Sequence, residues 1–432
     1  MALLCSGHLP VLASVLGTLN RMTSFTLSVE RWDIGVSIIR HDPRPFPAVC
    51  FLLGLPRSGR TLLAHLLQRH PDILAPPEPW LLLALEALGT VDHRHPAGQP
   101  VIRTATSEFL DRIERPAVYR AIADAAYARY LATAGKRLFI DKTPRYWMVL
   151  EFLESVYPSA PRILLMRNPY AIAASLKSTW GIPIQSASCP SAIGSCLADI
   201  ARGQPTPAIA STIADLVLGL PALAAQRGHP YTRPVQYELL VTRPDEVIGR
   251  LIAGLGYDRA LTALAMEQMD YLRSSNFGDR KILERKAIDD RSVDAWKTVL
   301  SPEEMQAVTD LVGAELLIEI GYEKELGYAQ KAGVVDRGRG VAEHYRRLFQ
   351  TSWDLLGGTR GTSFGISIGS EPNTAIEQAG AKSSTPGMSS GVTEPQHIAQ
   401  SSIDDTLRQV NSMVAELERA LEVSKSDPNE PR

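Results

Sequence analysis

The sequence predicts an α/β fold in which helices flank an open parallel sheet. Apolar runs at residues 48–53, 137–140 and 163–166 predict buried strands, and a helical segment follows each of them. A strand, a crossover helix and a second strand form the unit from which parallel sheets are built. With 432 residues, of which 45% are apolar, the chain is long enough for one large α/β domain with extensions.

The first predicted strand leads into a loop that suits an anion. Residues 51–68, FLLGLPRSGRTLLAHLLQ, combine a strand, a glycine-containing turn and a helix. This geometry points backbone N–H groups and a helix N-terminus at an anion, and Gly54 and Gly59 let the backbone approach it closely. The candidate ligands for a phosphate or a sulfate are Arg57, Ser58, Gly59, Arg60, Thr61 and Leu62.

Two further stretches carry groups that suit the same ligand. Glu78 lies among the prolines of residues 73–79, soon after the loop helix, where a carboxylate can face the anion site. Arg167 follows the strand 163–166, and Ser175 lies eight residues further on in the next predicted helix. Because ligands of open α/β sheets bind at the carboxyl ends of the strands, Arg167 and Ser175 are candidates for binding a second phosphate.

Three blocks together resemble a known enzyme family. Residues 56–62, PRSGRTL, resemble the 5′-phosphosulfate loop of the sulfotransferases that use 3′-phosphoadenosine 5′-phosphosulfate (PAPS). Arg167 and Ser175, with Pro169 between them, resemble that family's 3′-phosphate segment, and residues 141–146, DKTPRY, resemble the block that precedes it. The blocks follow one another in the family's order, and the resemblance covers residues 47–322.

The resemblance implies a P-loop nucleotide-kinase-like sulfotransferase fold and an enzyme that needs no metal. Such an enzyme moves a sulfuryl group from PAPS to a hydroxyl or amine acceptor by in-line displacement. Arg57 and the loop would neutralise the leaving group, Lys142 would stabilise the bridging oxygen or orient the acceptor, and Glu78 would be the base. The family's contacts to the 3′-phosphate and the adenine would fall on Arg167, Ser175, Tyr237, Arg285 and Lys286.

One departure keeps two alternatives open. Arg60 stands where the family usually has threonine and where a P-loop has lysine. A P-loop kinase or NTPase would hold magnesium through Thr61 and Asp141. A nucleotide-binding scaffold with a decayed site is the third possibility.

Composition excludes several classes of protein. A net charge of −2 gives no footprint for nucleic acid, and four cysteines are too few for a disulfide framework. We expect no membrane span because the chain has no run of 18 apolar residues. The first 19 residues carry no basic residue, so we expect a cytoplasmic protein, with Met1 or Met22 as its start.

We expect five segments along the chain. An N-terminal extension, 1–45, precedes the sulfotransferase-like α/β domain, 46–327, and a helical extension, 328–357. Residues 358–401 are rich in Gly, Ser, Thr and Pro and predict a disordered linker. Residues 402–424 have apolar residues four and three apart, which predicts either a coiled-coil helix that pairs with itself or a partner, or an amphipathic helix that docks on the body. The acceptor, whether a small molecule, a sugar or a lipid, is left open.

Overall fold

The computed structural model describes residues 48–91, 95–187, 190–201, 208–258, 288, 290–355, 407–419 and 421–422. All of them belong to one compact unit, Phe46–Arg432. The predicted extension 1–45, the predicted linker 358–401, and Arg285 and Lys286 lie outside the described residues.

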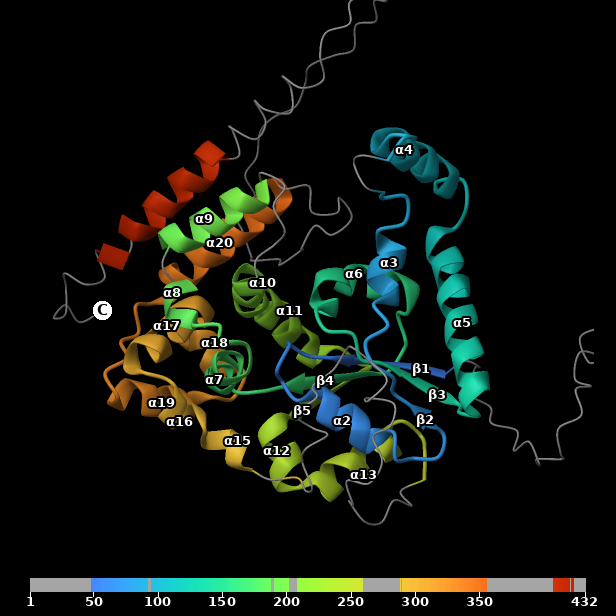
Figure 1. The fold of residues 1–432 in the computed structure, drawn as a ribbon. Helices are drawn as coiled ribbons and strands as arrows, with labels where there is room; N and C mark the ends of the chain where they lie inside the picture. Colours follow the sequence, from blue (N-terminus) through green and yellow to red (C-terminus); the bar gives the residue numbers. More distant parts are fainter. Residues whose placement is uncertain are drawn as a thin grey trace, which may run out of the picture. The chain divides into compact units, whose positions relative to one another are not determined.

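A parallel sheet organises the described chain (Figure 1). Its strands are β1 (Ala48–Leu53), β2 (Ile73–Leu74), β3 (Leu138–Asp141), β4 (Arg162–Met166) and β5 (Thr232–Gln236). The spatial order is β2-β3-β1-β4-β5, and each neighbouring pair is parallel. The predicted α/β class with an open parallel sheet is therefore confirmed. The sequence did not predict β2, because two residues are too few to show a period.

The sheet has a hydrophobic core on each face, because side chains alternate along a strand. From β1, Phe51 and Leu53 join one core, and Cys50 and Leu52 join the other. The second core is closed by α2 (Arg60–Leu67), α12 (Tyr237–Thr242) and α13 (Pro244–Gly254). The first is closed by helices that include α3 (Leu81–Glu86), α5 (Arg115–Ala134) and α6 (Leu150–Val156), on the opposite side of the sheet in Figure 1. Between α3 and α5 lies α4 (Gln99–Leu110).

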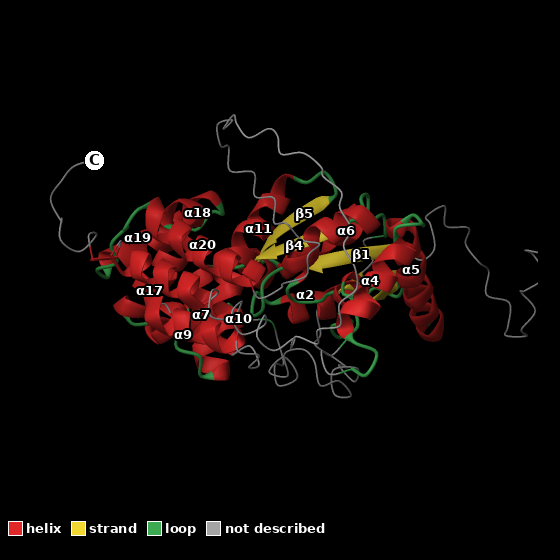
Figure 2. Cartoon of the chain, turned by 90° about the horizontal axis from the view of Figure 1, so that it is seen from above, coloured by secondary structure: helices red, strands yellow, loops and turns green. Residues whose placement is uncertain are grey.

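A mainly helical part lies beyond the carboxyl ends of the strands (Figure 2). It contains α7 (Pro169–Trp180), α8 (Ile184–Ala187), α9 (Pro190–Ala201), α10 (Ala208–Ala214), α15 (Arg291–Asp294), α16 (Trp296–Val299), α17 (Pro302–Val312), α18 (Ala314–Glu319), α19 (Glu323–Lys331) and α20 (Arg339–Leu355). A capping box between Ser301 and Glu304 starts α17. Residues 301–304, SPEE, predict this cap from the sequence, and the apolar residues after it predict a single helix to Gly321. The second prediction is wrong, because Gly313, at φ 88°, separates α17 from α18.

One continuous helix carries an uncommon turn. α10, the π-helical segment η2 (Asp215–Gly219) and α11 (Leu220–Ala225) follow one another directly. The stretch Ala208–Gly228 is long and apolar enough to cross a membrane, but 72% of its most apolar window is buried inside the protein. Core helices of soluble proteins have the same property, so this helix is weak evidence for a span.

The C-terminal helix packs on the body of its own chain. Residues 407–419 are helical, and Val410, Val414 and Leu417 are buried within the first core. A Cβ added to Gly194 of α9 would come within 2.7 Å of Val414 Cγ2, so the C-terminal helix and α9 are in close contact. Of the two arrangements that the heptad pattern left open, the structure shows the docked helix.

Candidate active site

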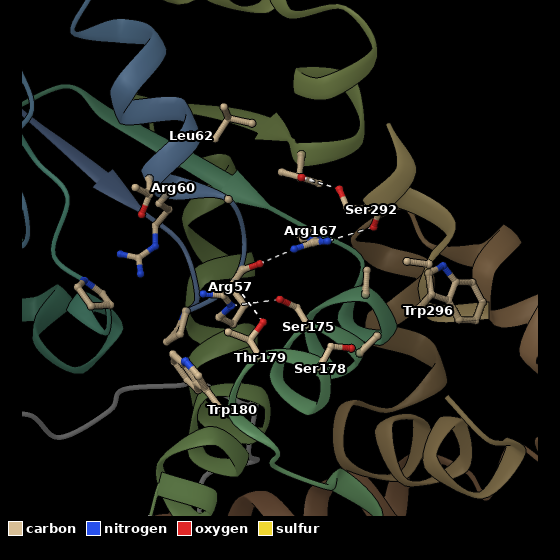
Figure 3. A pocket seen from close by; sticks show the side chains of 18 of the residues that line it. Arg57, Arg60, Leu62, Arg167, Ser175, Ser178, Thr179, Trp180, Ser292 and Trp296 are labelled. Carbon is tan, nitrogen blue, oxygen red and sulfur yellow. Dashed lines mark hydrogen bonds between the residues drawn. The ribbon is translucent and has the colours of Figure 1, made fainter. Parts of the chain in front are cut away.

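A cavity of about 570 Å³ opens at the carboxyl ends of the strands. Its wall combines the loop after β1, the segments that follow β3, β4 and β5, and the helices α7, α15 and α16 (Figure 3). The predicted site residues that line it are Arg57, Gly59, Arg60, Thr61, Leu62, Glu78, Arg167, Ser175 and Tyr237. Ser58 and Lys142 are buried and do not line it.

The two loop glycines are required by close neighbours. A Cβ on Gly54 would lie 2.7 Å from the carbonyl oxygen of Leu165 on β4. A Cβ on Gly59, whose φ is 96°, would collide with the ring of Tyr237. Between them, Arg57 has a φ of 65°, which is uncommon for a residue with a side chain. The loop therefore packs closely between β4 and Tyr237, the residue that follows β5. The N-terminus of α2, which follows the loop, faces the cavity.

Arg57 connects the loop to α7. Its Nε donates to Ser175 Oγ at 3.1 Å, and its Nη2 donates to Thr179 Oγ1 at 3.4 Å (Figure 3). The guanidinium also lies 5.5 Å from the ring centre of the exposed Trp180. Arg57 and Ser175 are 118 positions apart in the sequence, and the fold brings them into direct contact.

Arg167 connects the end of β4 to the loop and to α15. Its Nη1 donates to the Arg57 carbonyl oxygen at 2.7 Å, and its Nη2 donates to the Ser292 carbonyl oxygen at 3.1 Å. The guanidinium lies 4.3 Å from the ring centre of Tyr237, whose hydroxyl is 2.7 Å from Ser292 Oγ. Burial lowers the pKa of Arg167, and nearby Tyr237 and Glu238 oppose this effect. Sequence reasoning missed Ser292, because a lone serine in a charged stretch carries no motif.

Arg60 extends away from Arg167, toward the β3 side of the cavity (Figure 3). Its Nε donates to the Leu55 carbonyl oxygen at 3.2 Å, and its Nη1 donates to the Lys142 carbonyl oxygen at 3.3 Å. Burial lowers its pKa to about 10, against the opposing effect of Glu78 and Asp215. Arg60, which stands where the family usually has threonine, therefore connects the loop to residues 141–146. It also adds positive charge on the β3 side of the cavity.

Glu78 and Lys142 lie near each other. Glu78 Oε1 is 3.9 Å from Lys142 Nζ, and the Glu78 side chain is 16% exposed, against 2% for Lys142. Glu78 therefore reaches the cavity, while the lysine ammonium stands behind it. A carboxylate in this position can accept a proton from a group bound in the cavity.

The buried carboxylate of Asp141 accepts several hydrogen bonds, and these position the segment around Glu78. Its carboxylate accepts hydrogen bonds from the hydroxyls of Tyr127, Tyr146 and Thr143 at 2.7 to 2.8 Å and from the Thr143 N–H at 3.1 Å. Thr143 and Tyr146 in turn accept the N–H groups of Trp80 and Leu82. Burial raises the pKa of Asp141, and the hydrogen bonds oppose it. With both oxygens engaged and no exposure, Asp141 cannot serve as the magnesium ligand of the kinase alternative.

A second buried acid holds a cationic group that the sequence did not single out. Arg145 Nε lies 3.1 Å from both carboxylate oxygens of Asp215, and Nη2 lies 3.0 Å from Oδ2. The Trp147 indole donates to the same carboxylate at 2.8 Å. Arg145 lines the cavity beside Pro144. The sequence feature that could have indicated this pair is Asp215, because it is the one acidic residue within the apolar stretch 208–225.

The last features of the cavity are an aromatic side chain in its wall and its lack of a metal-binding cluster among the described residues. Trp296 is fully buried, stacks on Tyr170 at 5.0 Å and forms part of the wall. Within the described ranges, no three His, Cys, Asp or Glu side chains come together as metal ligands do.

Comparison with known proteins agrees with the family resemblance seen in the sequence. The profile of the Sulfotransferase family matches residues 49–260. The nodulation protein NoeE of Sinorhizobium fredii (strain NBRC 101917 / NGR234) is 59% identical over 388 residues, which are 89% of this chain and 92% of NoeE.

Two solved structures are similar as well. The sulfotransferase domain from the curacin biosynthetic pathway has a TM-score of 0.39 at 21% identity and covers 62% of this chain and 98% of that domain. The sulfotransferase domain of the Synechococcus PCC 7002 olefin synthase has a TM-score of 0.38 at 24% identity and covers 60% of this chain and 93% of that domain.

Proposed function

Because this chain belongs to the sulfotransferase family, we propose that its donor is PAPS and that it transfers the sulfuryl group in line to a hydroxyl or amine acceptor. The observation that carries the proposal is the spacing of two anion sites in one cavity. One is the loop after β1 with Arg57, and the other is Arg167 at the end of β4. A nucleotide with phosphoryl groups at both 3′ and 5′ positions needs two such sites.

One unsatisfied buried atom supports this fit. Among the described residues, none accepts a hydrogen bond from Arg167 Nε, although this atom is buried and Arg167 lines the cavity. A buried polar atom without a partner is unfavourable, so a ligand that supplies an acceptor oxygen there offsets that penalty.

The sheet order supports one orientation of the donor. Arg167, Ser175, Tyr237 and Ser292 lie toward β4 and β5, where they hold the 3′-phosphate and the adenine. The loop after β1, at the centre of the sheet, holds the 5′-phosphosulfate. The β2 and β3 side, which carries Glu78, is then left for the acceptor.

Each residue has a role in the transfer. Glu78 takes the proton of the acceptor hydroxyl as the acceptor oxygen forms its bond to sulfur. Arg57 and the loop N–H groups neutralise the charge that develops on the phosphate oxygen when its bond to sulfur breaks. Lys142, 3.9 Å behind Glu78, keeps that carboxylate oriented and adds positive charge near the bridging oxygen. Holding both reactants in line removes most of the entropic barrier.

We further propose that the acceptor is a saccharide hydroxyl. Trp80 and the half-exposed Trp180 lie in the cavity wall, and flat indole faces pack well on the apolar face of a sugar ring. The relative NoeE is named a nodulation protein, which directs the search to saccharides made for nodulation.

Thermal unfolding with donor products tests the donor proposal. Adenosine 3′,5′-bisphosphate at 100 times its Kd should stabilise the full chain by about 2.7 kcal/mol without magnesium. If ATP with magnesium stabilises the protein and the bisphosphate does not, the proposal is wrong. Incubation with ³⁵S-labelled donor and panels of sugars, phenols, lipids and peptides then identifies the acceptor class.

A further inference from the structure

Three unfavourable features meet at Arg145. Its φ is 62°, in the left-handed region that side-chain-bearing residues avoid. Its partner Asp215 is an acid buried in Ala208–Gly228, the helical stretch that is apolar enough to cross a membrane. Asp215 also begins the π-helical segment η2, and π-helical turns are rare and occur frequently at functional sites. Stability alone does not account for all three, because a hydrophobic pair would fill the same space at lower cost.

The geometry shows what the three features achieve. Asp215 engages Nε and Nη2 of Arg145, and Trp147 fixes the carboxylate from a second direction. Among the described residues, none accepts a hydrogen bond from Nη1 of Arg145. The Arg145 side chain is 28% exposed, while that of Asp215 is 6% exposed. The guanidinium is therefore held by its inner edge at the cavity wall.

Arg145 stands on the side of the cavity that the donor leaves open. It follows β3, as Lys142 does, and its charge acts on Arg60, which is also affected by Glu78 and Asp215. Arg167 and Tyr237, by contrast, follow β4 and β5 at the other side of the sheet. Arg145 and the base Glu78 thus belong to the same half of the cavity.

We propose that Arg145 binds the acceptor, that Asp215 is its positioning residue, and that the group recognised is a neutral hydroxyl pair. This inference rests on the proposed function. Because Asp215 already neutralises the guanidinium, its outer N–H groups suit uncharged oxygen atoms better than a carboxylate. A carboxylate would also meet Glu78, which reaches the cavity. The two other cations on this side are more buried: Lys142 lies behind Glu78, and Arg60 donates to backbone carbonyl oxygens. The site therefore prefers a neutral polyol over a uronate.

Two variants and one matched control test the assignment. Arg145→Lys removes the outer N–H groups of the planar guanidinium but keeps the positive charge. Asp215→Asn removes the ion pair that fixes the orientation of the Arg145 guanidinium. The control is Asp310→Asn, because the Arg337–Asp310 pair has nearly the same exposure, 21% and 7%, and does not line the cavity. The acceptors are neutral methyl glycosides and their matched methyl uronates, with labelled PAPS and the full chain at pH 7.5.

The expected result is a split between acceptor and donor. Both test variants should raise the acceptor KM roughly tenfold to a hundredfold, as the loss of a charge-assisted hydrogen bond does. They should keep the affinity for adenosine 3′,5′-bisphosphate within about twofold, and Arg145→Lys should reduce the preference for glycosides over uronates. Asp310→Asn should leave both the acceptor KM and the bisphosphate affinity unchanged.

Three outcomes overturn the inference. An unchanged acceptor KM in Arg145→Lys removes Arg145 from the acceptor site, even if Asp215→Asn fails to fold. An equal loss of bisphosphate affinity places Arg145 with the donor. Transfer to uronates but to no neutral glycoside refutes the class of ligand. If the unaltered chain does not bind adenosine 3′,5′-bisphosphate, that result would instead contradict the proposed donor.

Discussion

Arg167 donates a hydrogen bond of 2.7 Å to the backbone carbonyl oxygen of Arg57, which joins the end of β4 to the loop after β1. Arg57 is in a backbone conformation that costs roughly 1–2 kcal/mol, and this bond helps to hold it there. The two anion sites of the cavity are therefore one coupled unit. A change at Arg167 alters the loop as well as the 3′ end of the donor site.

Arg167→Ala should mainly weaken donor binding. The contact is similar in the ground and transition states, so affinity falls more than turnover at saturating donor. We expect a loss of roughly tenfold to a hundredfold in the affinity for adenosine 3′,5′-bisphosphate, measured by calorimetry. Arg233→Ala is the control, since Arg233 on β5 contacts only nearby carbonyl oxygens in the described structure. Equal affinities in the two variants would contradict the role of Arg167.

Glu78→Gln should separate binding from chemistry. The amide keeps the shape of the side chain but cannot take a proton, so turnover should fall by roughly 10²–10⁴ while bisphosphate affinity stays nearly unchanged. Glu86→Gln, in the neighbouring helix α3, is the control and should keep normal turnover. Near-normal turnover in Glu78→Gln would mean that another group is the base. His70, Asp72 and Asp141 are the next candidates for the base, and none of them lines the cavity.

Asp310 should make stability depend on pH in an uncommon direction. Burial raises its pKa to about 6, against the opposing effects of Arg337 and Gln306, compared with 3.8 for the unperturbed acid. A raised carboxyl pKa gives stability that is present below the unfolded pKa and lost as the pH rises through the folded pKa. The unaltered chain should thus lose on the order of 3 kcal/mol relative to Asp310→Asn between pH 3.8 and pH 6. Chemical unfolding of both proteins at several pH values measures this difference, and parallel curves would refute it.

Leu417→Ala should destabilise the protein if the C-terminal helix docks as described. Leu417 is fully buried in the first core, and truncating a buried leucine costs about 2–5 kcal/mol, up to the total docking energy of the helix. Glu418→Ala, on the exposed face, should leave the Tm unchanged. A Tm that does not move in either variant would mean that the helix serves a partner or a second copy.

Sequence alone predicted the features that depend on near neighbours. The strands β1, β3 and β4, the anion loop and the capping box of Ser301 and Glu304 are each encoded within a few consecutive residues. Periodicity, turn chemistry and capping act at that range. The three family-like blocks supplied the sulfotransferase identity for the same reason, since each is short and contiguous.

Only the tertiary structure decided how those pieces combine. Arg145 and Asp215 are 70 positions apart, and no local pattern pairs them. The direction of Arg60, the contacts of Ser292 and the docking of residues 407–419 on α9 likewise depend on which surfaces the packed core leaves available. Burial makes the difference, because a charge removed from water must find a partner wherever the fold provides one.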